Sequence, residues 1–259
     1  MSKIKTEAEI KILKEGGKKL AMVLRTVGKE VKPGVSTWFL NEKAKSLIDK
    51  AGGKAAFLNY TPEGALRPYP ASICISINDE IVHGIPNENP KILKDGDIVT
   101  LDCGISYKGL FTDSAITVIA GKGDKEKDKN AEKLIRATEE ALIAAIKVAV
   151  PGNRINDIGA AIEKVARKRG FSPAKDLGGH SVGHAIHEEP YIPNYKVSGK
   201  SALIEEGMVL AIEPMLVEGK GDIKLMPDGY TYSTKDGGRA AHAEHTVVIR
   251  KSRPEILTL

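Results

Sequence analysis

The chain has 259 residues, of which 41% are hydrophobic and 28% are charged, a composition typical of a globular protein with a substantial core. No segment has the apolar length of a membrane span, and the N-terminal MSKIKTEAEIKILKEGG lacks the apolar stretch of a secretory signal. The two cysteines, Cys74 and Cys103, lie in apolar strand-like runs, which favours a reducing compartment over a disulfide framework. We therefore expect a cytoplasmic protein that has no membrane partner.

The net charge of +5 would attract an anionic neighbour such as RNA. The lysines are spread over several amphipathic helices, however, so solvated helix faces explain the charge more simply than a nucleic-acid patch does. Docking at the ribosome surface is kept as a hypothesis that the charge motivates. We expect a monomer, although no sequence feature fixes the oligomeric state.

Two helices are predicted near the start of the chain. Thr6 and Glu9 form a capping box, and apolar residues follow at helical spacing as far as Val27. A second helix is expected to begin near Ser36 and to end before Gly52.

Strands and further helices are predicted along the rest of the chain. Residues 72–83 and 97–119 are apolar or alternating and rich in β-branched side chains, which is typical of strands. The charged, glycine-punctuated segment 121–130 is the best candidate for a linker. Two helices are expected over roughly 130–148 and 155–169, and strands and loops from about position 180 onward.

Two internal similarities indicate a duplication. The Pro-Gly pairs at 33–34 and 151–152 each precede a helix, and a glycine follows each helix at the same distance. The segment KDGDIVTLD (94–102) is echoed by EEGMVLAIE (205–213), where a carboxylate follows six positions after the glycine in both.

The duplication predicts how the chain is organised. We expect a single catalytic domain, 1–259, made of pseudo-symmetric α/β halves over about 1–120 and 130–250. Asp102 and Glu213 occupy equivalent positions in the two halves, so they should face each other at the junction.

Five side chains of metal-ligand type stand out. In chain order they are Asp102, Asp113, His180, Glu213 and Glu244. Asp102 interrupts the apolar run IVTLDCGI, and Glu213 interrupts MVLAIEPML. A carboxylate buried in such a run is costly unless a partner or a cation balances its charge. The five residues therefore predict one shared site.

The ligand types indicate which ions this site would hold. Asp102 and Asp113 flank a turn-like Tyr-Lys-Gly, which predicts adjacent antiparallel strands with both carboxylates on one face. Four carboxylates and one imidazole favour Mn(II), Fe(II) or Co(II) over a structural zinc ion. Four carboxylates also exceed the needs of one cation and favour two cations that share bridging ligands. Surface acids, or ion-pair partners of the many lysines, are the alternative interpretation.

The histidines are less specific. Glycines in GGHSVGHAIHEEPYIP (178–193) favour a loop or strand, and the segment lacks the second histidine of a helical zinc-protease motif. His83, in EIVHGIP, lies at a predicted strand end, a suitable place for an active-site side chain. His184, His242 and His245 are assigned structural roles by default.

Together, the segments IVHGIP, LDCG, FTDSA, GGH…IHEEP, AIEPM and AEHTVVI resemble a type I methionine aminopeptidase. The resemblance runs from the first helix to the last strand. It implies an α+β pita-bread fold, in which helices cover a central curved antiparallel sheet. Only 30 residues separate Glu213 from Glu244, which leaves no room for the helical insertion of type II enzymes. No N-terminal extension of the kind found in some relatives is expected.

The resemblance implies two divalent metal ions, Co(II), Mn(II) or Fe(II) in preference to Zn(II). Asp102, Asp113 and Glu244 would hold one ion, and Asp113, His180, Glu213 and Glu244 the other. Asp113 and Glu244 would bridge the two ions.

Catalytic roles follow from the same resemblance. Glu213 would shuttle a proton from the attacking water to the leaving amine. His187 would stabilise the tetrahedral oxyanion, and His83 would hydrogen-bond the peptide near the scissile bond. The substrate's α-amino group would bind the metal on the Asp102 side. The implied partners are nascent polypeptides that begin with Met followed by a small residue.

A pocket for the methionine side chain is also implied. Tyr69, Cys74, Ile186 and Tyr230 would line it, with core packing as the alternative role for each. Ile186 stands where an aromatic residue is frequent in the family, and Tyr230 where Trp is common. The segment 59–74 is longer than the family pattern. These differences concern the pocket and leave the five ligand positions intact.

Two other functions compete with this one. An Xaa-Pro aminopeptidase or prolidase shares the fold and the ligand order, but such enzymes generally carry an additional N-terminal domain. A metal-free relative that only binds proteins or nucleic acid would be expected to have lost ligands, and all five are present.

Overall fold

Four helices form where the sequence predicts them in the computed structural model, which describes residues 4–122 and 128–259. They are α1 (Glu7–Gly28), α2 (Thr37–Lys50), α3 (Asp128–Val148) and α4 (Ile155–Arg169). The capping box is confirmed, because the Thr6 hydroxyl accepts from the Glu9 N–H and the Glu9 carboxylate accepts from the Thr6 N–H. Ser36 caps α2 by accepting from the N–H of Phe39 at 3.2 Å.

The strands belong to one large sheet and two small ones, and every strand pairing is antiparallel. The first five are β1 (Lys54–Ala55), β2 (Cys74–Ile77), β3 (Glu80–Val82), β4 (Ile98–Tyr107) and β5 (Leu110–Ile119). The next five are β6 (Ser172–Pro173), β7 (Gly178–Ser181), β8 (Glu188–Pro193), β9 (Val209–Ile212) and β10 (Met215–Val217). The last five are β11 (Ile223–Leu225), β12 (Tyr232–Thr234), β13 (Ala240–His242), β14 (Glu244–Val248) and β15 (Glu255–Ile256).

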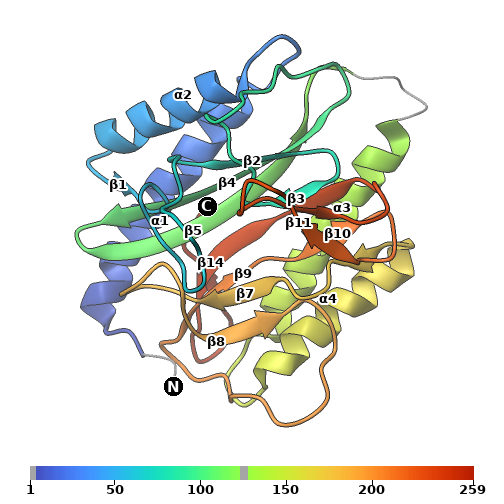
Figure 1. Cartoon of the computed structure of the whole chain (residues 1–259). Helices are drawn as coiled ribbons and strands as arrows, with labels where there is room; N and C mark the ends of the chain where they lie inside the picture. The colour runs from blue at the N-terminus through green and yellow to red at the C-terminus, as the bar shows by residue number, and fades with distance from the viewer. Residues whose placement is uncertain (1–3, 123–127) are drawn as a thin grey trace.

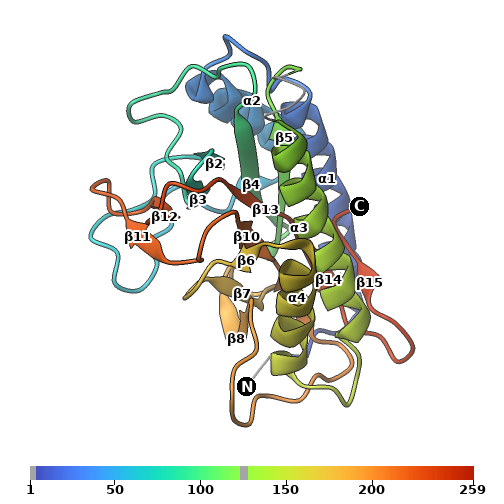
Figure 2. The same cartoon turned by 90° about the vertical axis from the view of Figure 1, so that its right-hand side faces the viewer.

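The large sheet has the order β1-β4-β5-β14-β9-β7-β8, with β2 also paired to β4 and β15 to β14. One small sheet is β13-β10-β6 and the other is β11-β12-β3. The helices α1 and α3 lie on one side of the large sheet, and the sheet of β3, β11 and β12 lies on the other (Figures 1 and 2). The predicted α+β architecture, with helices over an antiparallel sheet, is confirmed.

Each pair of helices covers its own hydrophobic core. Under α1 and α2, buried residues such as Leu24 and Leu40 pack on Leu101 of β4. Under α3 and α4, Ile158 packs with Leu210 of β9. The opposite face of the central strands is therefore left free to carry polar side chains.

The close approach of α1 to the sheet and to the C-terminal segment explains the glycines in its middle. A Cβ on Gly17 would lie 2.3 Å from the carbonyl oxygen of Leu257, and one on Gly16 would lie 3.2 Å from the Cβ of Tyr107. Only glycine lets the C-terminal segment pack against the helix backbone at Gly17.

Hydrogen bonds at the start of α2 recur at the start of α4. The N–H groups of Gly34 and Thr37 donate to the segment 91–93, at Leu93 and Lys91. In the same way, the N–H groups of the residues at 152 and 155 donate to Ile204 and to the residue at 202. These matching contacts support the proposal that the halves are related by duplication.

The predicted linker 121–130 needs a correction at its end, because α3 already begins at Asp128. Residues 123–127 lie outside the described residues. No helix in the described ranges is both long and apolar enough to cross a membrane.

Candidate active site

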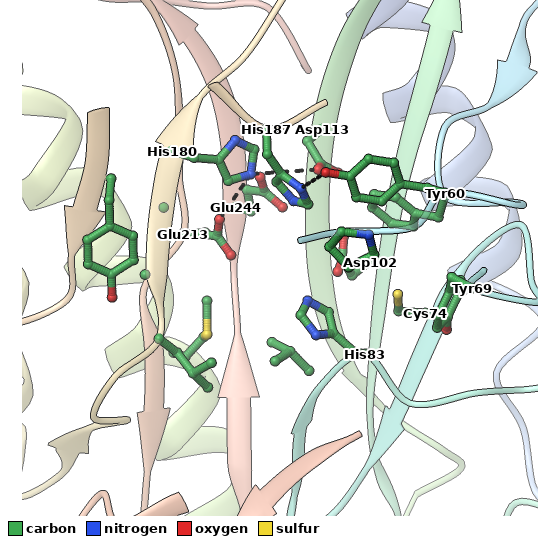
Figure 3. Close-up of a pocket in the computed structure, with 18 of the residues that line it drawn as sticks. Tyr60, Tyr69, Cys74, His83, Asp102, Asp113, His180, His187, Glu213 and Glu244 are labelled. Carbon is green, nitrogen blue, oxygen red and sulfur yellow. Dashed lines mark hydrogen bonds and ion pairs between the residues drawn. The ribbon is translucent and has the colours of Figure 1, made fainter. Parts of the chain in front are cut away.

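Five neighbouring strands of the large sheet each bring one of the candidate ligands to the site (Figure 3). In the spatial order β4-β5-β14-β9-β7 these are Asp102, Asp113, Glu244, Glu213 and His180, with Glu213 directly following β9. The two halves of the chain thus contribute to one cluster.

The strand register places these side chains on one face. Asp102 and Glu244 both pair with Ala115 of β5, so they occupy the same row. Asp113 lies two residues before Ala115 and therefore points the same way. The predicted placement of Asp102 and Asp113 on one face of a hairpin is confirmed by this register.

Glu213 and His180 share that face as well. His180 pairs with Ala211 of β9, which lies two residues before Glu213 and so points the same way. Ala211 also pairs with Thr246, which lies two residues after Glu244, so the same face continues onto β14. All five side chains line a cavity of about 510 Å³, and Figure 3 shows the carboxylates facing one another across it.

The distances between the side chains suit a shared cation better than direct hydrogen bonds. His180 Nε2 lies 3.4 Å from Glu213 Oε1 and 4.0 Å from Asp113 Oδ2. Asp113, His180 and Glu244 each present a ligand atom within 4.8 Å of the others, and so do Glu213, His242 and Glu244. The separations among Asp113, His180 and Glu244 match those of ligands around one ion.

The tautomer of His180 is set by the backbone. Its Nδ1 lies 2.9 Å from the carbonyl oxygen of Ser181, which can only accept, so Nδ1 carries the proton. Nε2 therefore turns its lone pair toward the carboxylates. A histidine that ligates a metal is typically oriented in this way.

The carboxylates are deeply buried, and no lysine or arginine among the described residues is paired with them. Burial, together with repulsion from Asp113, raises the pKa of Asp102 well above its ordinary value, and burial likewise raises the pKa of Glu213 and Glu244. Burial raises the pKa of Asp113 to about 7. Within the described residues their ion-pair partners are imidazoles, His180 and His242.

These features fit divalent cations. Burial lowers the pKa of His180 to about 3, so its imidazole supplies no positive charge at neutral pH. Asp102 Oδ1 and Glu244 Oε1 are buried and have no hydrogen-bond partner in the described part of the molecule. Unsatisfied oxygens in a cluster of four acids and a neutral imidazole are the donor set of a hard metal ion.

His83 enters the cavity from a strained turn after β3. Its φ of 60° is unusual for a residue other than glycine and costs about 1–3 kcal/mol. The turn is held by Tyr69, whose hydroxyl donates to the Gly84 carbonyl at 2.8 Å, and by the Gly84 N–H, which donates to Ser76 Oγ. Burial lowers the pKa of His83 to about 4, so its ring is neutral.

His187 lies beside the ligands and is oriented by a residue that the sequence did not single out. Its Nδ1 lies 3.0 Å from the hydroxyl of Tyr60, and its ring stands edge-on to that of His180 at 4.5 Å between centroids. The ring is accessible from the cavity, yet the surrounding protein lowers its pKa. Tyr60 had no distinguishing pattern in the sequence, because only its position in the fold brings it to His187.

The loop that carries His187 is tied down by a buried ion pair. Glu188 accepts from Lys5 Nζ at 2.7 Å and from the N–H groups of His184 and Ala185. The Lys5 side chain is fully buried, although it lies near the start of the chain. This contact spans 183 positions in sequence, so no local pattern could have predicted it.

An aromatic subsite adjoins the ligands. Its wall consists of Phe57, Tyr69, Cys74 and Tyr230, which line the cavity and share one hydrophobic cluster. The rings of Tyr69 and Tyr230 meet edge-on at 5.1 Å. Burial raises the pKa of the Cys74 thiol, which is therefore uncharged, and the predicted absence of a disulfide agrees with two free cysteines.

Ile186, the fourth residue of the predicted pocket, is buried in the same hydrophobic cluster and is not among the side chains that line the cavity. Its role in the pocket stays a prediction. A Cβ on Gly104 would lie only 3.0 Å from Ile186 Cδ1, so the Ile186 side chain packs against the backbone of β4 at Gly104.

The long segment 59–74 folds into a loop beside the subsite. Its base is closed by two backbone hydrogen bonds: the Tyr69 N–H donates to the Tyr60 carbonyl, and the Asn59 N–H donates to the Tyr69 carbonyl. Arg67 forms a bidentate pair with Glu88, and its carbonyl accepts from the Tyr230 hydroxyl. The loop therefore contacts and supports Tyr230 through Arg67.

Residues 11–251 match metallopeptidase family M24. A methionine aminopeptidase from Aquifex aeolicus is 48% identical to this chain over 98% of it and 97% of its own length. The crystal structure of a methionine aminopeptidase from Thermotoga maritima covers 100% of this chain and 99% of its own, with a TM-score of 0.92 and 40% identity.

Prolidase from Pyrococcus furiosus is a more distant neighbour. Its structure has a TM-score of 0.73 at 22% identity, and this chain covers 65% of it. That likeness shows a common fold, whereas the methionine aminopeptidases match in sequence along nearly the whole chain. The chain therefore belongs to metallopeptidase family M24 and, within it, to the methionine aminopeptidases of the pita-bread fold.

Proposed function

We propose that this protein removes the N-terminal methionine from nascent polypeptides by metal-assisted hydrolysis of the first peptide bond. The observation that carries the proposal is the cluster of five ligand-type side chains on five adjacent strands, beside a subsite walled by aromatic rings. Hydrolysis and recognition of an apolar first side chain are thereby joined in one cavity.

The cluster would hold two divalent cations. Asp102, Asp113 and Glu244 would hold one, and Asp113, His180, Glu213 and Glu244 the other, with Co(II), Mn(II) or Fe(II) preferred by these ligand types. When bound, the cations supply Lewis acidity toward the scissile carbonyl and make a water molecule acidic enough to attack near neutral pH.

The surrounding side chains would supply proton transfer and orientation. Glu213 lies at the end of β9 and lines the cavity, so its carboxylate can take a proton from the water and pass it to the leaving amine. His187, oriented by Tyr60, would donate to the developing oxyanion. His83, neutral and held in its turn, would hydrogen-bond the substrate backbone.

The subsite explains the choice of methionine. An unbranched thioether side chain adapts to an irregular apolar pocket and makes favourable contacts with aromatic rings. Tyr69, Cys74 and Tyr230 supply such a wall and carry no charge at neutral pH.

The direct test is a peptide assay on metal-stripped protein. We expect Met-Ala-Ser to be hydrolysed when Mn(II), Co(II) or Fe(II) is returned, and an Ala-Pro peptide to be left intact. Turnover of the Xaa-Pro peptide alone would indicate a prolidase-like enzyme. Failure to turn over either peptide with any of these ions would indicate a binding protein of the same fold.

The net charge of +5 motivates a weaker contact with the ribosome surface. Such a contact would place the cavity near emerging chains. Because screening weakens electrostatic attraction, co-sedimentation with ribosomes should decrease as salt is raised. Binding that is insensitive to salt would contradict this mode of docking.

A further inference from the structure

His242 is a fully buried histidine that the proposed chemistry leaves without a role. It ends β13 and is 1% exposed, and neither ring nitrogen has a hydrogen-bond partner among the described residues. A buried imidazole without partners is costly, so its position calls for a compensating interaction.

The backbone holds this ring firmly in place. The N–H of His242 donates to Thr117 Oγ1 at 3.0 Å, and the same hydroxyl donates to the His242 carbonyl at 2.6 Å. His242 also pairs with Met215 of β10. The imidazole is therefore presented to its neighbours from a rigid strand.

His242 and His180 flank Glu213 and approach different oxygens of it. His180 Nε2 lies 3.4 Å from Oε1, and His242 Nε2 lies 3.4 Å from Oε2. His242 Nε2 is also 3.9 Å from Glu244 Oε2. Glu213 Oε1 therefore faces His180, and Glu213 Oε2 faces His242.

We propose that His242 is a positioning residue, whose Nε2–H donates a hydrogen bond to Glu213 Oε2 and so reserves Oε1 for the metal beside His180. This inference rests on the proposed metal centre. A shift of a few tenths of an ångström brings the 3.4 Å separation into hydrogen-bond range. Such a bond strengthens when the carboxylate is ionised by ion binding.

Position separates this role from that of a sixth ligand. His180 and the four carboxylates line the catalytic cavity, whereas His242 lines a separate cavity of about 100 Å³ that also contacts Leu142 of α3. The ring therefore lies behind the carboxylates as seen from the substrate. The second cavity is large enough to hold water. Partners of this kind orient the ligands of metal sites.

The test measures metal affinity and ligand geometry in addition to activity. Mn(II) is titrated by calorimetry into metal-stripped wild type, His242→Ala and His242→Gln, and visible spectra are recorded with Co(II). We expect His242→Ala to weaken Mn(II) binding roughly 10–100-fold. His242→Gln retains an N–H donor, so it should bind within about threefold of wild type and give the wild-type Co(II) spectrum.

His245→Ala is the matched control. His245 lines the same second cavity, but its Nδ1 lies 2.9 Å from Thr258 Oγ1 and it pairs with no carboxylate of the described residues. Its loss should therefore leave Mn(II) affinity within about twofold. Melting of the metal-free variants checks that each is folded.

Two results would overturn the inference. Unchanged Mn(II) affinity in folded His242→Ala would show that the ring positions nothing. Failure of His242→Gln to restore affinity, together with a changed Co(II) spectrum, would show that His242 is itself a ligand. If wild type itself binds no Mn(II), the proposed metal centre fails, and the role of His242 fails with it. If wild type binds Mn(II) and only the His242 variants behave unexpectedly, the role of His242 alone fails.

Discussion

Replacing Asp113 with asparagine should have opposite effects on the metal-free and the metal-loaded protein. In the metal-free protein, Asp113 is a buried acid whose pKa is raised from an ordinary 3.8 to about 7. Ionising Asp113 in the folded state therefore destabilises the fold, whereas asparagine stays neutral and causes no such destabilisation. The amide oxygen of asparagine can still accept from the Ser114 N–H, as Asp113 Oδ1 does at 3.0 Å.

The magnitude follows from the pKa. A rise from 3.8 to about 7, at about 1.4 kcal/mol per pH unit, corresponds to at most about 4–5 kcal/mol of unfolding free energy. Because the folded-state pKa is the higher one, the penalty is absent below about pH 4, grows as pH rises, and is complete above pH 7. At pH 7.5, Asp113→Asn should therefore melt at a higher temperature than wild type, by at most roughly 10 °C. Near pH 4 the two proteins should melt at the same temperature.

The assay is thermal melting of chelator-treated proteins between pH 4.5 and 7.5. Asp222→Asn is a suitable control, because Asp222 pairs with Lys175 at the surface, which lowers its pKa, so its replacement should give no such stabilisation. With metal returned, Asp113→Asn should lose more turnover than the roughly 10–100-fold typical of an outer-shell partner. A metal-free Asp113→Asn that is less stable than wild type at pH 7.5 would show that ionised Asp113 does not destabilise the metal-free protein.

Three further predictions concern the surroundings of the cluster. Tyr60→Phe should lower kcat on Met-Ala-Ser roughly tenfold without changing the melting temperature, because it removes one hydrogen bond to His187. Lys5→Met should lower the free energy of unfolding by about 3 kcal/mol, measured as a lower urea midpoint, because Glu188 loses its buried partner. Calorimetry in two buffers at pH 7 should show proton release on Mn(II) binding, since burial raises the pKa of Asp113 to about 7 and a ligand must lose its proton to bind metal; no release would contradict that raised pKa.

Local patterns in the sequence are sufficient to predict the elements and the shared face of Asp102 and Asp113. The capping box at Thr6 and the Pro-Gly pairs predict where helices begin, since these signals act over a few residues. The alternation around Asp102 and Asp113 predicts their shared face, because side-chain direction has period two in a strand.

What the sequence could not supply depends on contacts between distant segments. Tyr60 reaches His187 across 127 positions, and Lys5 reaches Glu188 across 183. The sequence predicts Ile186 in the pocket wall. In the structure it packs against β4 at Gly104, where glycine leaves room for it. His242 was assigned a structural role because nothing near it in sequence shows that Glu213 lies within reach.

We propose that Asp102, Asp113, His180, Glu213 and Glu244 together hold two metal ions. Anomalous diffraction from crystals of the Mn(II)-loaded protein tests this most directly. We predict two peaks, one contacted by Asp102, Asp113 and Glu244, and one contacted by Asp113, His180, Glu213 and Glu244. Peaks elsewhere, or a fully loaded cluster that leaves Asp102 or His180 without a metal contact, would contradict it.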